Sequence, residues 1–192
     1  MRLVIFVLLL LLSTSSSLAF EDNIGYSKIT PESPVYFLKT VRENLELKFA
    51  LTTRVRNLRQ LEFATRRLRE AKTLIPINQD LIPPTLERYA SHLNTIPDKD
   101  LNNQELSNGI KQALSMHLLV LQQIYPGANL RSRMFIRSAM NRIIQRADVP
   151  TFAKAPVCAF FSKEASSSAL NQTEQSVLGD RAKKCFQAVT SL

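Results

Sequence analysis

The chain has 192 residues with 25 basic and 16 acidic side chains, which give a formal net charge of +9 at pH 7. This length is enough for one compact domain with a sizeable core or for two small domains. Four glycines and no tryptophan argue against a glycine-rich catalytic loop and against a turn-dense β-sandwich, whereas frequent Leu, Ala, Arg, Gln and Glu favour helices.

Residues 1–19 have the layout of a secretory signal peptide. Ten apolar residues, Leu3–Leu12, follow Arg2, and small residues precede an expected cleavage site between Ala19 and Phe20. The apolar run is about half of the ~20 residues that a membrane-spanning helix needs. We therefore expect export with cleavage, and a membrane attachment only if the segment stays uncleaved. An uncleaved anchor remains the alternative.

A helical domain is predicted over residues 31–149, after a flexible lead at 20–30. Ser33 and Pro34 predict a helix start, as the N-cap and the first helical residue. We expect Tyr36 and Phe37 to hold this helix against its neighbour. Its apolar residues recur at helical spacing: Phe37, Leu38, Val41, Leu45 and Phe49.

The next predicted helix is the clearest in the chain, and Pro76 ends it. Its apolar stripe consists of Leu51, Val55, Leu58, Leu61, Thr65, Leu68 and Ile75. The opposite side carries Arg56, Arg59, Arg66 and Glu70. We therefore expect these four charged side chains to face solvent.

Three more helices complete the predicted domain. Residues 80–96 form a helix with Pro83 and Pro84 in its first turn or at a kink. A long amphipathic run over 106–124 ends at Pro126, and a helix over 130–147 follows. Three arginines are expected on the outer face of that last helix: Arg131, Arg142 and Arg146.

A C-terminal helical hairpin is predicted over residues 150–192, with helices at 155–166 and 173–190. Asn171 and Glu174 have the spacing of a capping box. The two cysteines, Cys158 and Cys185, predict a disulfide between the two helices, because an exported chain reaches an oxidising compartment. Two separate buried thiols are the alternative. No alternating strand pattern is seen, so the predicted class is all-α, a bundle of about five helices plus this hairpin.

The order of several motifs in the first third resembles a known family. The motifs are Pro31–Lys39 (PESPVYFLK), Arg42–Glu43, Arg66–Ala71 (RRLREA) and Leu86–Tyr89 (LERY). Over about residues 29–96 the chain resembles the bacterial exported domain of unknown function numbered fifty-six sixty-seven. Val35 departs mildly, because the family commonly has Leu there. The resemblance implies a bacterial setting and a helical fold outside the cytoplasm, and it implies no activity and no catalytic residues.

Catalytic and metal-binding patterns are not found in the sequence. His92 and His117 lie outside any H-x-x-x-H, E-x-x-H or C-x-x-C-H spacing, and no G-x-S-x-G turn is present. We therefore expect no enzyme, no metal and no cofactor. An enzyme of a kind that motifs do not reveal remains an alternative.

Basic helix faces are the remaining functional signal. Arginines gather in two regions, and we consider them as contacts for an anionic partner: Arg56, Arg59, Arg66, Arg67, Arg131, Arg142 and Arg146. An envelope polymer or another envelope protein would suit them, whereas the lack of interleaved aromatic residues gives no specific nucleic-acid signal. A solvated helix surface is the simpler alternative.

The function expected from the sequence is a non-catalytic interaction or structural module of the bacterial cell envelope. A periplasmic or extracellular holdase chaperone is the second hypothesis, because basic exported helical proteins with amphipathic faces can hold unfolded clients. The unrecognised enzyme is the third.

Overall fold

The computed structural model describes residues 24–98 and 104–190. Within these ranges the chain forms seven α-helices and one short 3-10 helix, with no strand. The elements are α2 (Tyr36–Lys48), α3 (Thr53–Leu74), η1 (Gln79–Leu81), α4 (Ile82–Asn94), α5 (Gln104–Ile124), α6 (Leu130–Ile144), α7 (Thr151–Ala165) and α8 (Gln172–Thr190). The all-α class is confirmed. The predicted signal peptide and its cleavage site at Ala19 and Phe20 lie outside the described residues.

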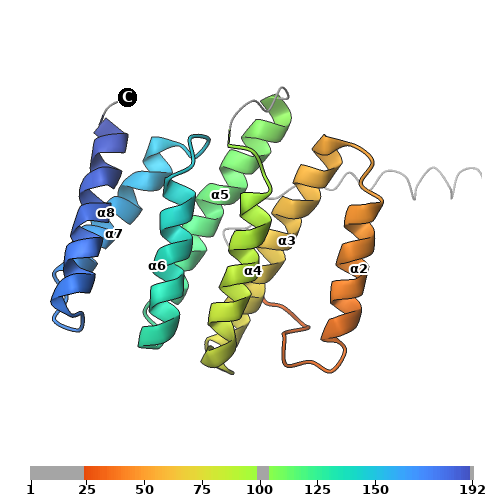
Figure 1. Cartoon of the computed structure of the whole chain (residues 1–192), viewed down its shortest axis with the longest axis horizontal. Helices are drawn as coiled ribbons and strands as arrows, with labels where there is room; N and C mark the ends of the chain where they lie inside the picture. The colour runs from red at the N-terminus through yellow and green to blue at the C-terminus, as the bar shows by residue number, and fades with distance from the viewer. Residues whose placement is uncertain (1–23, 99–103, 191–192) are drawn as a thin grey trace, which may run out of the picture.

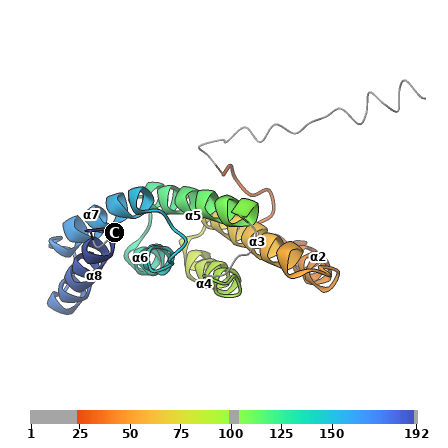
Figure 2. The same cartoon turned by 90° about the horizontal axis from the view of Figure 1, so that it is seen from above.

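Consecutive helices pair into three hairpins, α3–α4, α5–α6 and α7–α8, which stand side by side (Figure 1). Seen from above, α3, α5 and α7 form one layer, and α4, α6 and α8 form the other (Figure 2). Contacts run within each hairpin and between neighbouring hairpins, as in stacked helical repeats. Helix α2 stands at the end of the array away from α8 (Figure 1).

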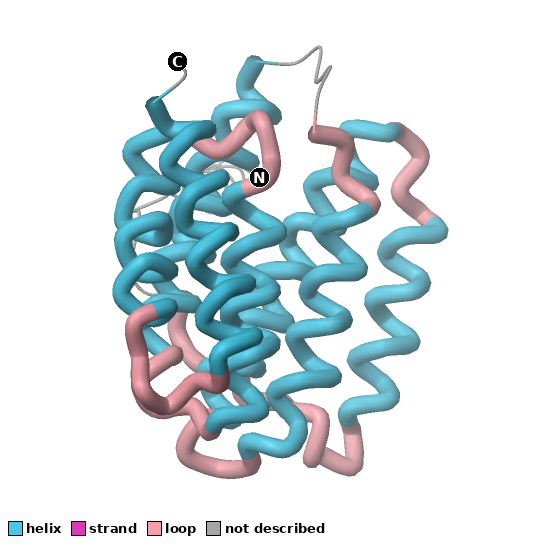
Figure 3. Tube along the Cα trace, turned by 60° about the vertical axis from the view of Figure 1, so that its left-hand side comes forward, coloured by secondary structure: helices cyan, strands magenta, loops and turns pink. Residues whose placement is uncertain are grey.

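One hydrophobic core runs between the two layers. Its largest fully buried side chains include Phe63 on α3, Tyr89 on α4, Leu114 on α5 and Phe161 on α7. Consecutive helices run in opposite directions, so their connections lie at the tops and bottoms of the helices in Figure 3. None of the helices in residues 24–98 and 104–190 is long and apolar enough to cross a bilayer.

Side-chain caps set several helix starts. The Thr52 hydroxyl accepts a hydrogen bond from Val55 N at the start of α3, at 3.2 Å. The predicted capping box before α8 is confirmed, because Asn171 Oδ1 accepts from Glu174 N at 2.9 Å and Glu174 Oε2 accepts from Asn171 N at 3.1 Å.

Two predicted helix starts are wrong. Helix α2 begins at Tyr36, and its N-cap is Val35 without a side-chain cap, because the backbone around Ser33 and Pro34 turns first. Helix α7 begins at Thr151, before the predicted start at 155. The carbonyl of Pro150 accepts the first helical bonds there, so the helix contains Pro156 in its interior.

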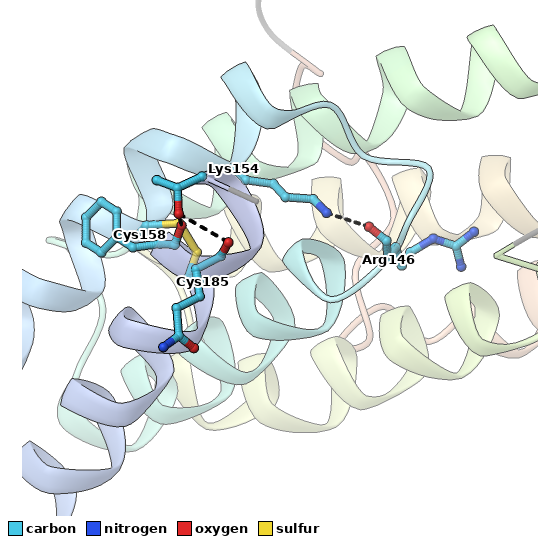
Figure 4. The surroundings of a disulfide bond; sticks show 7 residues. Arg146, Lys154, Cys158 and Cys185 are labelled. Carbon is cyan, nitrogen blue, oxygen red and sulfur yellow. Dashed lines mark hydrogen bonds between the residues drawn. A yellow bond between two sulfur atoms is a disulfide. The ribbon is translucent and has the colours of Figure 1, made fainter. Parts of the chain in front are cut away.

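The C-terminal hairpin is held by the predicted disulfide, which is confirmed. Cys158 on α7 and Cys185 on α8 are bonded, with their Cα atoms 5.5 Å apart, and both are buried. Figure 4 shows the bond beside Lys154, whose ammonium donates to the carbonyl of Arg146 at 2.7 Å. This contact ties α7 to the end of α6.

The described part of the predicted lead packs on the domain. Ser27 N donates to Thr73 Oγ1 at 2.8 Å, and Arg69 Nε donates to the carbonyl of Ile24. The Lys72 ammonium lies 4.7 Å from the centre of the Tyr26 ring. Residues 24–30 thus follow the surface of α3.

Candidate interaction surface

Helix α2 turns its apolar side to solvent. Phe37 is 63 % exposed and Phe49 is 76 % exposed, and Leu51 in the following turn is 92 % exposed. We call the exposed apolar residues of this region the α2 ridge: Phe37, Leu38, Val41, Leu45, Phe49 and Leu51. The expectation that Phe37 holds the helix against its neighbour is wrong. Isolated exposed apolar residues are ordinary, but a row of six on one helix and its turn makes the ridge a candidate interaction surface.

A polar network occupies the inner side of α2 and explains this orientation. Glu70 on α3 is fully buried, and its carboxylate accepts hydrogen bonds from Tyr36 Oη at 3.0 Å and from the Lys39 ammonium. Arg67, only 2 % exposed, donates to both oxygens of Glu70 at 2.6 and 2.7 Å and to Glu43. The inner face of α2 therefore binds α3 through charges, which leaves the apolar face outside.

Tyr36 is the hub of this network. Its hydroxyl lies 3.1 Å from Arg88 on α4 and also accepts from Arg67, so it joins three helices. Burial, with the nearby Glu70 charge, raises the pKa of Tyr36 to about 12. Burial by itself lowers the pKa of Arg67, but the carboxylates of Glu70 and Glu43 raise it overall. Tyr36 is thus neutral and Arg67 is positively charged at neutral pH.

A second ion-pair group lies at the edge of the same interface. Arg66 donates to Glu62 at 2.5 Å and to Glu43 at 3.4 Å, and Arg59 donates to Glu62 at 2.7 Å. Burial by itself raises the pKa of Glu62, but the hydrogen bonds from Arg59 and Arg66 lower it overall. These arginines are therefore engaged by carboxylates of the same chain.

The seven predicted anion contacts do not form one surface. Arg67 and Arg146 are buried, so the prediction that they face an external partner is wrong. Arg59 and Arg66 are held in ion pairs, and Arg142 donates to Asn94. The remaining two, Arg56 on α3 and Arg131 on α6, are exposed. Whether any of them binds an anion stays a prediction.

Arg146 instead connects α6 to the end of α4. It donates to Asp148 at 2.7 Å and to the carbonyls of Ile96 and Pro97 at 3.0 and 3.1 Å, and it pairs with Asp98 at 2.7 Å. The predicted outward position fails because the carbonyls at the end of α4 need donors, and Arg146 supplies them. Glu70 was also expected to face solvent, and it is buried for the reason given above.

Both histidine rings form hydrogen bonds with other side chains of the fold. The Thr65 hydroxyl donates its hydrogen to the Leu61 carbonyl, so the hydrogen bond of 2.9 Å between Thr65 Oγ1 and His117 must be donated by His117 Nε2. The other ring nitrogen of His117, Nδ1, then accepts from Tyr89 Oη at 3.1 Å. Burial lowers the pKa of His117 to about 3. Burial lowers the pKa of His92 to about 4, and the positive charge of Arg67 contributes to this shift. His92 Nδ1 also lies 2.8 Å from Oε1 of Gln60.

No cluster of three or more His, Cys, Asp or Glu side chains suited to a metal is found among residues 24–98 and 104–190. In the same part of the chain, the carboxylates of Glu43 and Glu70 accept hydrogen bonds from Arg67. His92 forms its hydrogen bond with Gln60.

A basic cleft lies along one flank of α2. It has a volume of about 590 Å³, and its five basic lining residues are Lys28, Lys39, Arg42, Arg66 and Arg69. Its apolar lining residues are Ile29, Val35 and Leu38, and no acidic residue lines it. Since Leu38 also belongs to the α2 ridge, the cleft and the ridge are continuous.

We did not predict from the sequence that the charged face of α2 packs on α3, although the sequence contains a signal of this orientation. Tyr36, Lys39, Glu43 and Glu46 recur on the face of α2 opposite Phe37, Val41 and Leu45. The adjacent Arg66 and Arg67 could have been matched to the glutamates of that face. Helical periodicity alone separates two faces and does not say which one is buried.

Comparisons with known proteins agree with the resemblance noted in the sequence and extend it. The family model of a domain of unknown function, DUF5667, matches residues 28–127, which is more than half of the chain and covers α2 to the end of α5. Neither a curated protein nor a solved structure matches the chain. The chain belongs to the DUF5667 family, a domain of unknown function.

Proposed function

We propose that this chain is a non-catalytic interaction module of the bacterial cell envelope that binds its partner through the α2 ridge. The observation that carries the proposal is the inverted orientation of α2. A helix that buries Glu43 and leaves Phe37 and Phe49 in solvent loses the free energy that burial of the aromatic rings would provide. A partner that covers the ridge would bury these rings and regain that free energy.

The envelope location rests on two features. The N-terminal segment has the layout of a signal peptide, and the Cys158–Cys185 disulfide suits an oxidising compartment. The family resemblance adds the bacterial setting. An interaction role needs no catalytic group, which fits a ridge built from apolar side chains.

Site-specific photo-crosslinking tests the proposal. A benzophenone amino acid replaces Phe49 on the ridge in the full chain, which is expressed and exported in a bacterial host before irradiation. Ile77, which is 58 % exposed in the α3–α4 connection, is the matched control position. We expect defined adducts with an envelope component, protein or lipid, from position 49 and none from position 77.

A second variant ties these adducts to the ridge. Val41→Asp adds a charge at the middle of the ridge, where the side chain is exposed, so the domain should keep its stability. The adducts from position 49 should disappear in this background while the thermal unfolding curve is unchanged. Equal adducts from positions 49 and 77 would contradict the proposal.

A holdase chaperone is the second candidate, because exposed Phe37 and Phe49 are also what an unfolded client would contact. A test protein unfolded by heat distinguishes the two. Suppression of its aggregation at a stoichiometric ratio, lost in Val41→Asp, would favour the chaperone. Undiminished aggregation would remove it.

A further inference from the structure

The outward side of α2 combines apolar and basic residues and lacks acidic ones. Both glutamates of the helix, Glu43 and Glu46, are turned toward α3, where they contact Arg66 and Arg67. Arg42, with 72 % of its side chain exposed, and Lys48 lie on the outward side with the ridge residues. A partner on this side therefore meets apolar, positively charged and neutral polar groups of α2, while both glutamates of the helix face α3.

The basic cleft next to the ridge adds a site for an anion. Lys28 is exposed and has no ion pair with any other residue that the structure describes. Arg42 pairs with Glu46 at 2.7 Å, and Glu46 is not among the residues that line the cleft. Among the described residues, Lys28 thus gives the cleft a positive charge without a carboxylate partner, and Arg42 adds a second positive charge that is largely exposed to solvent.

We propose that the α2 ridge and the basic cleft together bind the surface of a bilayer that contains anionic phospholipids. The headgroup phosphate occupies the cleft near Lys28 and Arg42, and Leu38, Phe37 and Val41 enter the boundary between headgroups and acyl chains. The inference rests on the proposed function, because it names the partner of the same ridge. Phe and Leu on one face with Lys and Arg beside them are the pattern of helices that lie in the membrane interface.

The shape of the region favours a flat partner. Helix α2 is the last element at its end of the helix array, so the ridge projects from an edge of the molecule (Figure 1). It contacts α3 on its inner side, and none of the other helices in residues 24–98 and 104–190 covers its outer side. A projecting edge can enter a bilayer surface without any change in the rest of the fold.

Other occupants explain fewer of these observations. A symmetric dimer places the same surface against itself, so Arg42 and Lys48 of one copy would approach those of the other, and like charges at an interface are unfavourable. An anionic wall polymer would use the cleft but would leave Phe37 and Phe49 uncovered. An anionic amphiphile satisfies both parts.

Vesicle binding tests the inference with the exported chain. The two probes are vesicles of phosphatidylcholine alone and vesicles of phosphatidylcholine mixed with phosphatidylglycerol. The double variant Lys28→Gln with Arg42→Gln is compared with Lys163→Gln combined with Lys183→Gln, which removes the same charge from exposed sites elsewhere. Each basic residue near an anionic surface contributes about a fivefold change in affinity, since it is worth ~1 kcal/mol.

The expected result is that the cleft variant binds mixed vesicles about 25-fold more weakly, whereas the control pair changes binding by about twofold or less. Val41→Asp should weaken binding to both kinds of vesicle, because it disrupts the apolar contact. Equal losses in the two charge-neutralised variants would overturn the cleft assignment. Binding of free glycerophosphate without binding to vesicles would overturn the membrane assignment and leave a small-anion site.

Failure of this inference is distinguishable from failure of the proposed function. Adducts from position 49 that contain an envelope protein, together with no vesicle binding, would reject the membrane and keep the interaction module. A concentration-dependent dimer that Val41→Asp dissociates would reject the membrane in favour of a second copy. The absence of both adducts and vesicle binding would reject both proposals.

Discussion

The buried carboxylate of Glu70 should decide whether α2 stays on the domain. We predict that Glu70→Gln loosens α2 while α3–α8 remain folded. Glu70 is fully buried and is an acceptor for Tyr36, Lys39 and Arg67. Glutamine has nearly the same volume but no charge, so the side chain of Arg67 loses one of its two carboxylate partners while it stays buried.

The expected loss is about 3 kcal/mol in the free energy of docking of α2, because removal of one partner of a buried ion pair costs about 3–5 kcal/mol and glutamine retains an acceptor. The apolar residues of α2 offer little compensation, since Phe37, Val41 and Leu45 are exposed in the native state. Local opening of α2 should therefore become easier than global unfolding.

Hydrogen exchange provides the assay. Amides within Tyr36–Lys48 should exchange about 100-fold faster in Glu70→Gln, whereas amides of α5 and α6 keep their protection. Glu62→Gln is the matched control, because Glu62 also pairs with arginines but is 42 % exposed, and such pairs contribute about 0–1 kcal/mol. Equal exchange rates of α2 amides in the two variants would refute the argument that the buried network holds this helix.

Three further predictions concern stability. Reduction of the Cys158–Cys185 bond, which closes a sequence separation of 27, should lower the free energy of unfolding by about 3–4 kcal/mol; an unchanged thermal midpoint with and without reductant would contradict this. Burial lowers the pKa of His117 from 6.5 to about 3, so below pH 6.5 the unfolded chain binds a proton that the native chain does not. Stability should therefore fall as the pH drops, by about 2 kcal/mol between neutral pH and pH ~5, and urea titrations of His117→Gln should lack this part of the slope. Arg146→Gln should lower the free energy of unfolding by about 3 kcal/mol because it leaves Asp148 and two carbonyls at the end of α4 without their donor. Exposed Arg142→Gln should change it by less than about 1 kcal/mol, and similar losses in these two arginine variants would show that Arg146 is not a structural residue.

Much of the architecture was predictable from local sequence. Periodicity located every helix from α2 to α8, and the Asn171–Glu174 spacing predicted the cap of α8. The two cysteines predicted the disulfide because only one pairing exists. Helix starts near prolines were less predictable, since the interior position of Pro156 depends on where the preceding backbone begins to turn.

The burial of individual charges was not predictable in the same way. Arg67 and Arg146 occupy positions that a helical projection assigns to solvent, and each is buried by partners from distant parts of the chain: Glu43 for Arg67, and the carbonyls of Ile96 and Pro97 for Arg146. Such partners depend on how helices pack, and a single helix contains no information about its neighbours. The packing of α2 on α3 was therefore needed before the candidate surface could be recognised.

The orientation of α2 is not the one that apolar burial alone would select. If burial of apolar area alone decided its rotation, Phe37 and Leu45 would face α3, and Glu43 would face solvent. The observed rotation needs Arg67, Glu70 and Tyr36 at fixed positions to neutralise the buried charges. Local rules that a fold violates tend to be violated where a surface is used. Under the proposed function, the buried network is the support that keeps the α2 ridge exposed to a partner.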